Sequence, residues 1–133
     1  MAQNKIYKTT DYDFAKFKHE VEYWIDKFGL KEIELTIGHD QTDDDARAFA
    51  CSDTESKTCQ IVLQKNWNLI PENEEIERIA FHEVIETLLG DLWFHAMNRF
   101  STELEMESAR HAIIRRLENV FWKPDFDSRK KKK

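Results

Sequence analysis

Residues 79–94 read IAFHEVIETLLGDLWF, and this stretch decides the expected fold. At about 100° of rotation per residue, its large apolar side chains fall on nearly every side of a helix. A helix that is apolar all round is buried inside a domain. We therefore expect a core helix that begins after Pro71, where acidic residues favour a first turn, and that runs to about Ala96.

Three polar residues, His82, Glu83 and Glu86, interrupt the apolar surface of this helix. They share an arc of about 100°, and His82 and Glu86 lie one turn apart on the same face. Burying a carboxylate without a partner costs roughly several kcal/mol, so these groups require cations or strong hydrogen-bond donors. A divalent metal ion meets that need with one set of ligands.

A second helix supplies further candidate ligands. Thr102 and Glu105 form an expected capping box at its start, and Pro124 is expected to end it. Within this helix, Glu107 and His111 are four residues apart, so they project from one face. That face borders an apolar stripe that should pack on the first helix, made of Met106, Ile113, Ile114, Leu117 and Phe121.

Two antiparallel helices joined by the short connection 97–100 would bring the two polar pairs opposite each other. The sequence therefore predicts a metal centre whose ligands are drawn from His82, Glu86, Glu107 and His111. Zinc is the expected ion, with iron or manganese as alternatives. A second interpretation needs no metal, because the same side chains and an arginine could satisfy one another in a buried polar network.

The N-terminal part of the chain predicts one more helix. It should start at Thr10, with Asp13 completing an approximate capping box, and stop at Gly29. Its apolar residues recur with helical spacing and define a core-facing side, formed by Phe14, Phe17, Val21, Trp24, Ile25 and Phe28.

The middle of the chain predicts a small sheet. Alternating apolar and polar residues indicate a strand over 33–37, followed by a polar loop over 38–45. Residues 46–52 and 58–64 indicate two further strands joined by a polar turn, which makes an antiparallel hairpin. We therefore expect an α+β fold with a three-stranded sheet rich in antiparallel pairing.

Length and charge limit the organisation of the chain. At 133 residues it has the size of one domain, which we expect over 1–124, followed by a basic, disordered tail over 125–133. The tail holds five of the positive charges although the whole chain has a net charge of −6, so the body is strongly acidic. An acidic body is unsuited to nucleic acid, which only the tail could contact.

No apolar run approaches the roughly 18 residues that span a bilayer, and residues 1–5 lack the apolar stretch of a signal peptide. We therefore expect a cytoplasmic protein that does not enter a membrane. Cys51 and Cys59 are expected to be reduced in that compartment. They lie on neighbouring expected strands, so a cysteine pair that helps to hold metal stays open.

Two helical motifs carry a resemblance to a known family. The stretch HEVIETLL at residues 82–89 resembles the active-site helix of the small zincin-like metallopeptidases that are common in phage and prophage genomes. The stretch ESARHAIIRRLEN at residues 107–119 is similar to the closing helix of that family, and LQKNW at residues 63–67 is similar to the segment before the metal helix. The likeness covers roughly residues 30–122.

The resemblance implies a minimal zincin-like domain and metal-assisted hydrolysis of a peptide bond. His82 would be a zinc ligand, and Glu83 would be the general base that takes a proton from the metal-activated water. Glu107 or His111 would complete the ligand set, and both could bind.

One residue departs from the family pattern. The family pattern His-Glu-x-x-His has its second histidine replaced here by Glu86. Ligands His82, Glu86 and Glu107 would cancel the charge of a divalent ion and acidify its water less than a set with two neutral histidines. Using His111 in place of Glu107 restores two histidines and one carboxylate, a set that suits zinc and also iron(II).

Two functional hypotheses follow. In the first, the protein is a zinc metallopeptidase that acts on a peptide or protein substrate. In the second, it is a metal-binding zincin-like scaffold without peptidase activity, a phage accessory protein that binds a host protein. Both place it in the cytoplasm, which is that of the host cell if a phage encodes it. The oligomeric state stays open.

Overall fold

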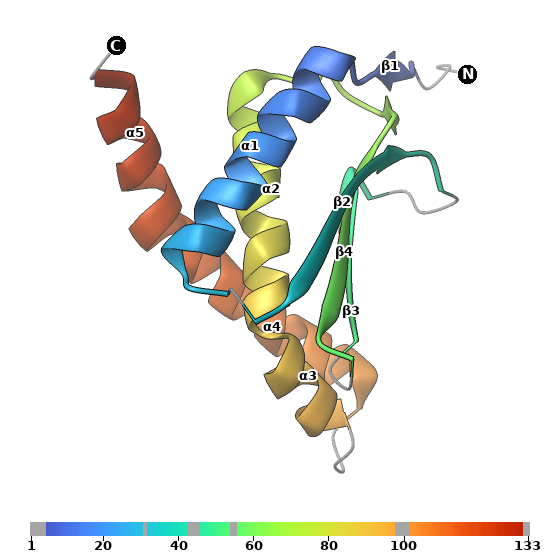
Figure 1. Cartoon of the computed structure of the whole chain (residues 1–133), viewed down its shortest axis with the longest axis vertical. Coiled ribbons are helices and arrows are strands. Elements are labelled where there is room, and N and C mark those ends of the chain that lie inside the picture. The colour runs from blue at the N-terminus through green and yellow to red at the C-terminus, as the bar shows by residue number, and fades with distance from the viewer. Residues whose placement is uncertain (1–4, 31, 43–45, 54–55, 98–101, 132–133) are drawn as a thin grey trace.

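Helix α2 lies at the centre of the molecule in the computed structural model (Figure 1). The structure describes residues 5–30, 32–42, 46–53, 56–97 and 102–131. In chain order, the elements are β1 (Tyr7–Lys8), α1 (Asp11–Lys27), β2 (Glu34–Asp40), β3 (Ala48–Asp53), β4 (Thr58–Gln64), β5 (Asn66–Trp67), α2 (Asn73–Leu88), α3 (Gly90–Met97), α4 (Glu103–Leu117), the π-helical turn η1 (Glu118–Trp122) and α5 (Lys123–Lys131).

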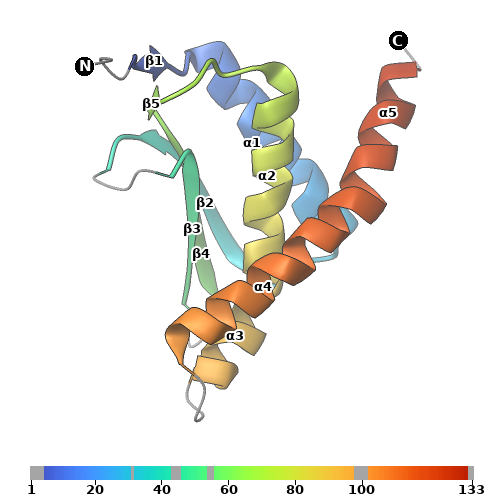
Figure 2. The ribbon, with the colours of Figure 1, turned by 180° about the vertical axis from the view of Figure 1, so that it is seen from behind.

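Three groups of elements surround α2. It packs along α1, against the sheet through β3, and against α4 and η1. From behind, α4, η1 and α5 follow one another as a long helical stretch that crosses α2 (Figure 2). The fold is therefore α+β, as expected. No helix among the described residues is long and apolar enough to cross a membrane.

Local sequence signals explain both ends of α1. The amide of Asp13 donates to Thr10 Oγ1 at 3.1 Å, and the amide of Thr10 donates to Asp13 Oδ2 at 2.9 Å. This reciprocal capping box satisfies two amides that a helix start leaves without partners. Gly29 has a φ of 69°, which an L side chain rarely adopts, and the helix ends just before it. Both expected boundaries are confirmed.

The main sheet has the strand order β2-β4-β3. Strands β3 and β4 form the expected antiparallel hairpin, but β2 pairs with β4 in parallel. The expectation of an antiparallel-rich sheet is wrong here, because the chain reverses twice between β2 and β4 and β4 then lies between the other two strands. Strand β2 also continues to Asp40, into the segment expected as a loop, because Gly38, His39 and Asp40 pair with β4. Residues 43–45 of that loop lie outside the described residues.

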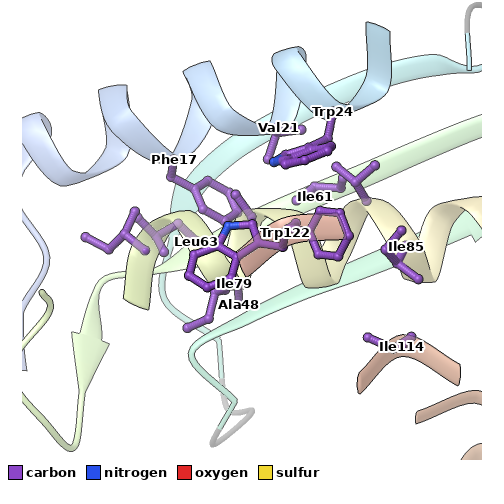
Figure 3. Packing of buried hydrophobic residues seen from close by; sticks show 14 of the residues in the cluster. Phe17, Val21, Trp24, Ala48, Ile61, Leu63, Ile79, Ile85, Ile114 and Trp122 are labelled. Atoms are coloured by element: carbon purple, nitrogen blue, oxygen red, sulfur yellow. The ribbon is translucent and has the colours of Figure 1, made fainter. Parts of the chain in front are cut away.

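The core forms where α1, β4 and α2 meet (Figure 3). Trp24 of α1 contacts the edge of Phe81 of α2, with 4.6 Å between ring centroids. Edge-to-face pairs of this kind stabilise a core beyond the area that they bury. The expected core side of α1 is confirmed by its fully buried residues Phe17, Val21 and Trp24.

The expected core helix is interrupted. Helix α2 ends at Leu88, Leu89 leaves the regular helical conformation with a ψ of 3°, and α3 begins at Gly90. Glycine is a poor helix former, so a break at this point costs little. The expectation that this whole stretch is buried is wrong from the end of α2 onward, since Leu88, the last residue of α2, is 37% exposed and Leu92 of α3 is 60% exposed.

The C-terminal segment differs most from its expected structure. Pro124 does not end the helix, and residues 125–131 are helical instead of disordered. In η1 the amide of Lys123 bonds to Glu118 O, five residues back, and this wider turn gives room for the proline ring. Phe126 is buried against Trp122, and Arg129 donates to both carboxylate oxygens of Glu20 at 2.6 and 3.1 Å. Residues 132–133 lie outside the described residues.

Candidate metal centre

A polar stripe runs along the side of α2 that faces α4 and η1. It contains Arg78, His82 and Glu86, which are four residues apart and therefore lie one above another. His82 contacts Glu118, whereas Glu86 contacts Arg110 and His111. The contacts run in opposite chain order on the two elements, so α2 and this stretch are antiparallel, as expected. The connection at 98–101 lies outside the described residues.

Three of the four expected ligands come together where α2 packs against α4. His82 Nε2 lies 3.9 Å and His111 Nε2 lies 3.6 Å from the same oxygen, Glu86 Oε1. One ligand atom from each residue lies within 4.8 Å of the other two. The imidazole rings meet edge to face, with 5.5 Å between their centroids. Both rings thus point a nitrogen at one carboxylate oxygen.

The donor set is one that could hold a small divalent ion. Zinc binds nitrogen and oxygen ligands at about 2.0–2.1 Å in a tetrahedron, which puts neighbouring donors about 3.3 Å apart. The separations of 3.9 and 3.6 Å exceed this by about 0.6 and 0.3 Å, and the three donor atoms lie within 4.8 Å of one another, so the side chains would have to move closer to hold the ion. His111 Nε2 is also buried without a hydrogen-bond partner among the described residues, and a metal ion would satisfy that atom.

Glu118 orients His82 from behind. Its Oε1 lies 3.2 Å from His82 Nδ1. An ionised carboxylate can only accept, so Nδ1 carries the proton of this hydrogen bond, and a neutral ring then presents the Nε2 lone pair toward Glu86 and His111. A histidine that binds metal commonly donates its other nitrogen to a carboxylate in this way.

Glu118 was not among the residues predicted from the sequence to belong to this centre. A local signal for it exists, because Glu118 follows His111 by seven residues and therefore projects from the same face two turns later. Which residue of this face lies opposite His82 depends on how the two helices pack, and residue spacing within one helix does not predict that.

A chain of ion pairs extends the stripe away from the candidate centre. Arg78 donates to Glu118 Oε2 at 2.9 Å and to Glu75 Oε2 at 3.2 Å, and Arg47 of the β3 side also pairs with Glu75. Burial raises the pKa of Glu118, but hydrogen bonds from His82 and Arg78 outweigh burial, so its pKa lies below the ordinary value. Glu118 therefore stays an acceptor, as the His82 hydrogen bond requires.

Arg110 closes the other end of the centre. Its Nη2 lies 3.3 Å from Glu86 Oε1, and its guanidinium stacks over the Trp93 ring at 4.3 Å from the centroid.

Glu83 is buried beside the ligand set. It is 4% exposed, and its Oε2 has no hydrogen-bond partner among the described residues. Burial raises the pKa of Glu83 well above its ordinary value, and the neighbouring Glu86 raises it further. Its carboxyl group therefore holds a proton more strongly than an exposed glutamate does.

Glu107, the fourth expected ligand, does not join the group of His82, Glu86 and His111. Its side chain is exposed and lines a groove of about 460 Å³ beside Glu86, which also borders β3 and α3. Neither cysteine is bonded in a disulfide; Cys51 is exposed and Cys59 is buried against Thr87, with 3.2 Å between Sγ and Oγ1. The described part of the chain thus gives no cysteine pair at this centre.

No known protein family matches this chain, and no curated protein or solved structure matches it either.

Proposed function

We propose that this protein holds a divalent metal ion, zinc in the first place, between His82, Glu86 and His111 and uses it to hydrolyse a peptide bond. The observation that carries the proposal is the approach of two imidazole nitrogens to one oxygen, at 3.9 and 3.6 Å from Glu86 Oε1. His111 Nε2 is buried and has no hydrogen-bond partner in the part of the chain that the structure describes, which counts against a polar network that needs no metal.

The second set of contacts supports the same proposal. Glu118 accepts from His82 Nδ1, so the ring is held in one orientation and its free nitrogen faces the other ligands. Arg78 pairs with the second oxygen of Glu118 and keeps that carboxylate in place. Carboxylates that fix metal-binding histidines contribute about 10- to 100-fold to metal affinity in known sites.

Bound to two neutral histidines and one carboxylate, the ion would keep a net positive charge and would act as a Lewis acid on a carbonyl group and lower the pKa of water. Glu83 is the proposed general base, since it follows His82 directly and contacts Glu86. Trp93 and Arg110 border the groove beside Glu86, where a peptide would lie. In this proposal the protein would be a zincin-like peptidase with Glu86 at the second histidine position.

The burial of Glu83 favours a second candidate. At 4% exposure, its carboxyl group has little access to water or substrate. A metal-binding scaffold without peptidase activity, which acts by binding a host protein, fits that observation. The metal centre is common to both candidates, so one set of variants distinguishes them.

Elemental analysis of the purified protein is the first test. We expect zinc, iron or manganese at near one equivalent, lost in His82→Ala and in His111→Ala. Glu107→Gln is the matched control, because it removes a carboxylate from α4 outside the ligand group and should keep the metal. A protein that carries none of these ions and takes up none would refute both candidates.

Glu83→Gln then tests the chemistry. The variant should keep its metal and lose peptide cleavage, measured as release of new amino termini from a denatured protein substrate. Unchanged cleavage would rule out Glu83 as the base. A wild-type protein with full metal and no cleavage, together with a specific host protein retained equally by wild type and Glu83→Gln, would favour the scaffold.

A further inference from the structure

The groove beside Glu86 has an apolar side. Trp93, Phe94 and Met97 of α3 line it, and Phe94 is 41% exposed. Helix α3 begins after the break at Leu89, so these side chains turn toward the groove instead of continuing the buried surface of α2. A partly exposed aromatic and thioether surface of this kind suits the aliphatic part of a side chain.

The same groove has an acidic side. Glu103 and Glu107 lie one turn apart on α4 and both line it. Neither forms an ion pair with a described residue, whereas Glu118 and Glu86 are paired with Arg78 and Arg110. Arg110, the cation that lines the groove, is already paired with Glu86 and stacked on Trp93. Among the described residues, no cationic side chain forms an ion pair with either of these two carboxylates.

A lysine or arginine side chain combines the two properties that this lining would bind. Its methylene stem can lie along an apolar surface while its cationic head reaches a carboxylate. Hydrogen bonds from a cation to a carboxylate are also stronger than hydrogen bonds between neutral groups. A volume of about 460 Å³ leaves room for such a side chain together with the backbone that carries it.

We infer that this groove binds a lysine or arginine side chain of a peptide next to the metal centre, with Glu103 and Glu107 as the residues that select the charge. The inference rests on the proposed function for the peptide nature of the ligand. It goes beyond that function because it names the side chain that the site prefers.

The test compares two short peptides, acetylated and amidated at their ends, that carry either lysine or norleucine at the central position. Norleucine keeps the stem and removes the charge. Calorimetric titration of the purified protein should give a dissociation constant roughly three- to tenfold lower for the lysine peptide, as expected for two partly exposed ion pairs. The preference should weaken at high salt.

Variants on α4 assign the preference to its residues. The double variant Glu103→Gln/Glu107→Gln should bind both peptides equally, whereas Glu105→Gln, an exposed glutamate of the same helix outside the groove, should keep the wild-type preference. Glu103→Lys/Glu107→Lys should reverse the preference, so that a glutamate peptide binds best. Because an unfolded variant would not gain affinity for the glutamate peptide, this result would exclude loss of the fold as the cause.

Equal affinity for the two peptides, no measurable binding of either, or a lysine preference that survives in the double variant would overturn the inference. So would 1,5-diaminopentane that binds as tightly as the lysine peptide, because the ligand would then be a free amine. Metal content is measured in the same samples. A lysine preference in a protein that holds no metal would refute the proposed function but support the binding of a cationic side chain in the groove. Metal-dependent cleavage without a lysine preference would support the proposed function and refute the binding of a cationic side chain.

Discussion

The two sides of helix α2 are buried by different physical means. Toward α1, Phe81 is fully buried against the aromatic rings of Trp24 and Phe28. Toward α4, His82 and Glu86 are enclosed by Glu118, Arg110 and His111, and their side chains keep 22% and 14% exposure. The first side is stabilised by removal of apolar surface from water, and the second by specific partners.

This difference decides what each side can do. Apolar burial is non-directional, so the side toward α1 needs close packing of its side chains but no specific polar partner. Polar burial stabilises only when every group finds a partner of the right sign and distance. On the polar side, His111 Nε2 is one of the buried atoms without a hydrogen-bond partner among the described residues, and it is the atom that the proposed metal ion would bind.

The largest expected effect concerns the apolar side. Phe81→Ala should lower the free energy of unfolding by about 3–5 kcal/mol, because it leaves a cavity against Trp24 and Phe28. Urea denaturation followed by circular dichroism measures this loss. Leu104→Ala, at a residue that is 75% exposed, is the control and should change stability by less than about 0.5 kcal/mol. Similar losses in both variants would contradict the assignment of the core.

The next effect concerns the polar side. A ligand that binds only the folded protein stabilises it, by about 2.7 kcal/mol at a concentration 100 times its dissociation constant. Zinc should therefore raise the melting temperature of the wild type and leave that of His111→Ala unchanged. A zinc-dependent rise in His111→Ala equal to that of the wild type would show that the ion binds elsewhere.

Glu118 should tune the centre without being part of it. Glu118→Gln should weaken zinc binding about 10- to 100-fold, because the amide cannot hold His82 as a carboxylate does. Competition with a chelating dye measures the affinity. Glu107→Gln removes a carboxylate from the neighbouring helix and should bind zinc like the wild type. If zinc affinity falls in Glu107→Gln and not in Glu118→Gln, then Glu107 and not Glu118 supports the metal centre.

The smallest effect is a dependence on pH. Burial raises the pKa of Glu75, but the hydrogen bonds and charges of Arg78 and Arg47 outweigh it and hold the pKa below the ordinary value of 4.5. The unfolded chain then binds the proton more tightly, so stability from this carboxylate is present above about pH 4.5 and lost as the pH falls below it.

The Glu75→Gln variant tests this dependence. It should be less stable than the wild type at pH 6, by on the order of 1 kcal/mol, and the difference should shrink toward pH 3. Thermal melts across this range measure it. Glu74→Gln removes a more exposed carboxylate of the same turn and should leave the acid limb unchanged. A difference from wild type that stays constant with pH would exclude the ion pairs as its cause.

Local patterns predicted much of this fold. The capping box at Thr10, the stop at Gly29 and the hairpin of β3 and β4 all follow from residues that interact within a few positions or across one turn. The parallel pairing of β2 with β4 could not be read in the same way. It depends on which strand occupies the middle of the sheet, and contacts between segments distant in the sequence decide that.

The C-terminal segment shows a second limit of local rules. Pro124 is a helix breaker in isolation, yet the chain stays helical through it because η1 widens the turn and Phe126 and Arg129 contact the body of the protein. Tertiary contacts of this size outweigh the preference of a single residue.

By itself, the sequence determined that His82 and Glu86 share one face of a helix and that His111 lies on another polar helix face, because helical periodicity is a local property of the backbone. It left Glu107 and His111 as equal candidates. Only the tertiary structure shows that His111 lies next to Glu86, that Glu107 lies outside the ligand group and that Glu118 contacts His82 Nδ1. The depth at which two helices cross is decided by side chains packed along their whole length, such as Ile85, Ile114 and Trp122.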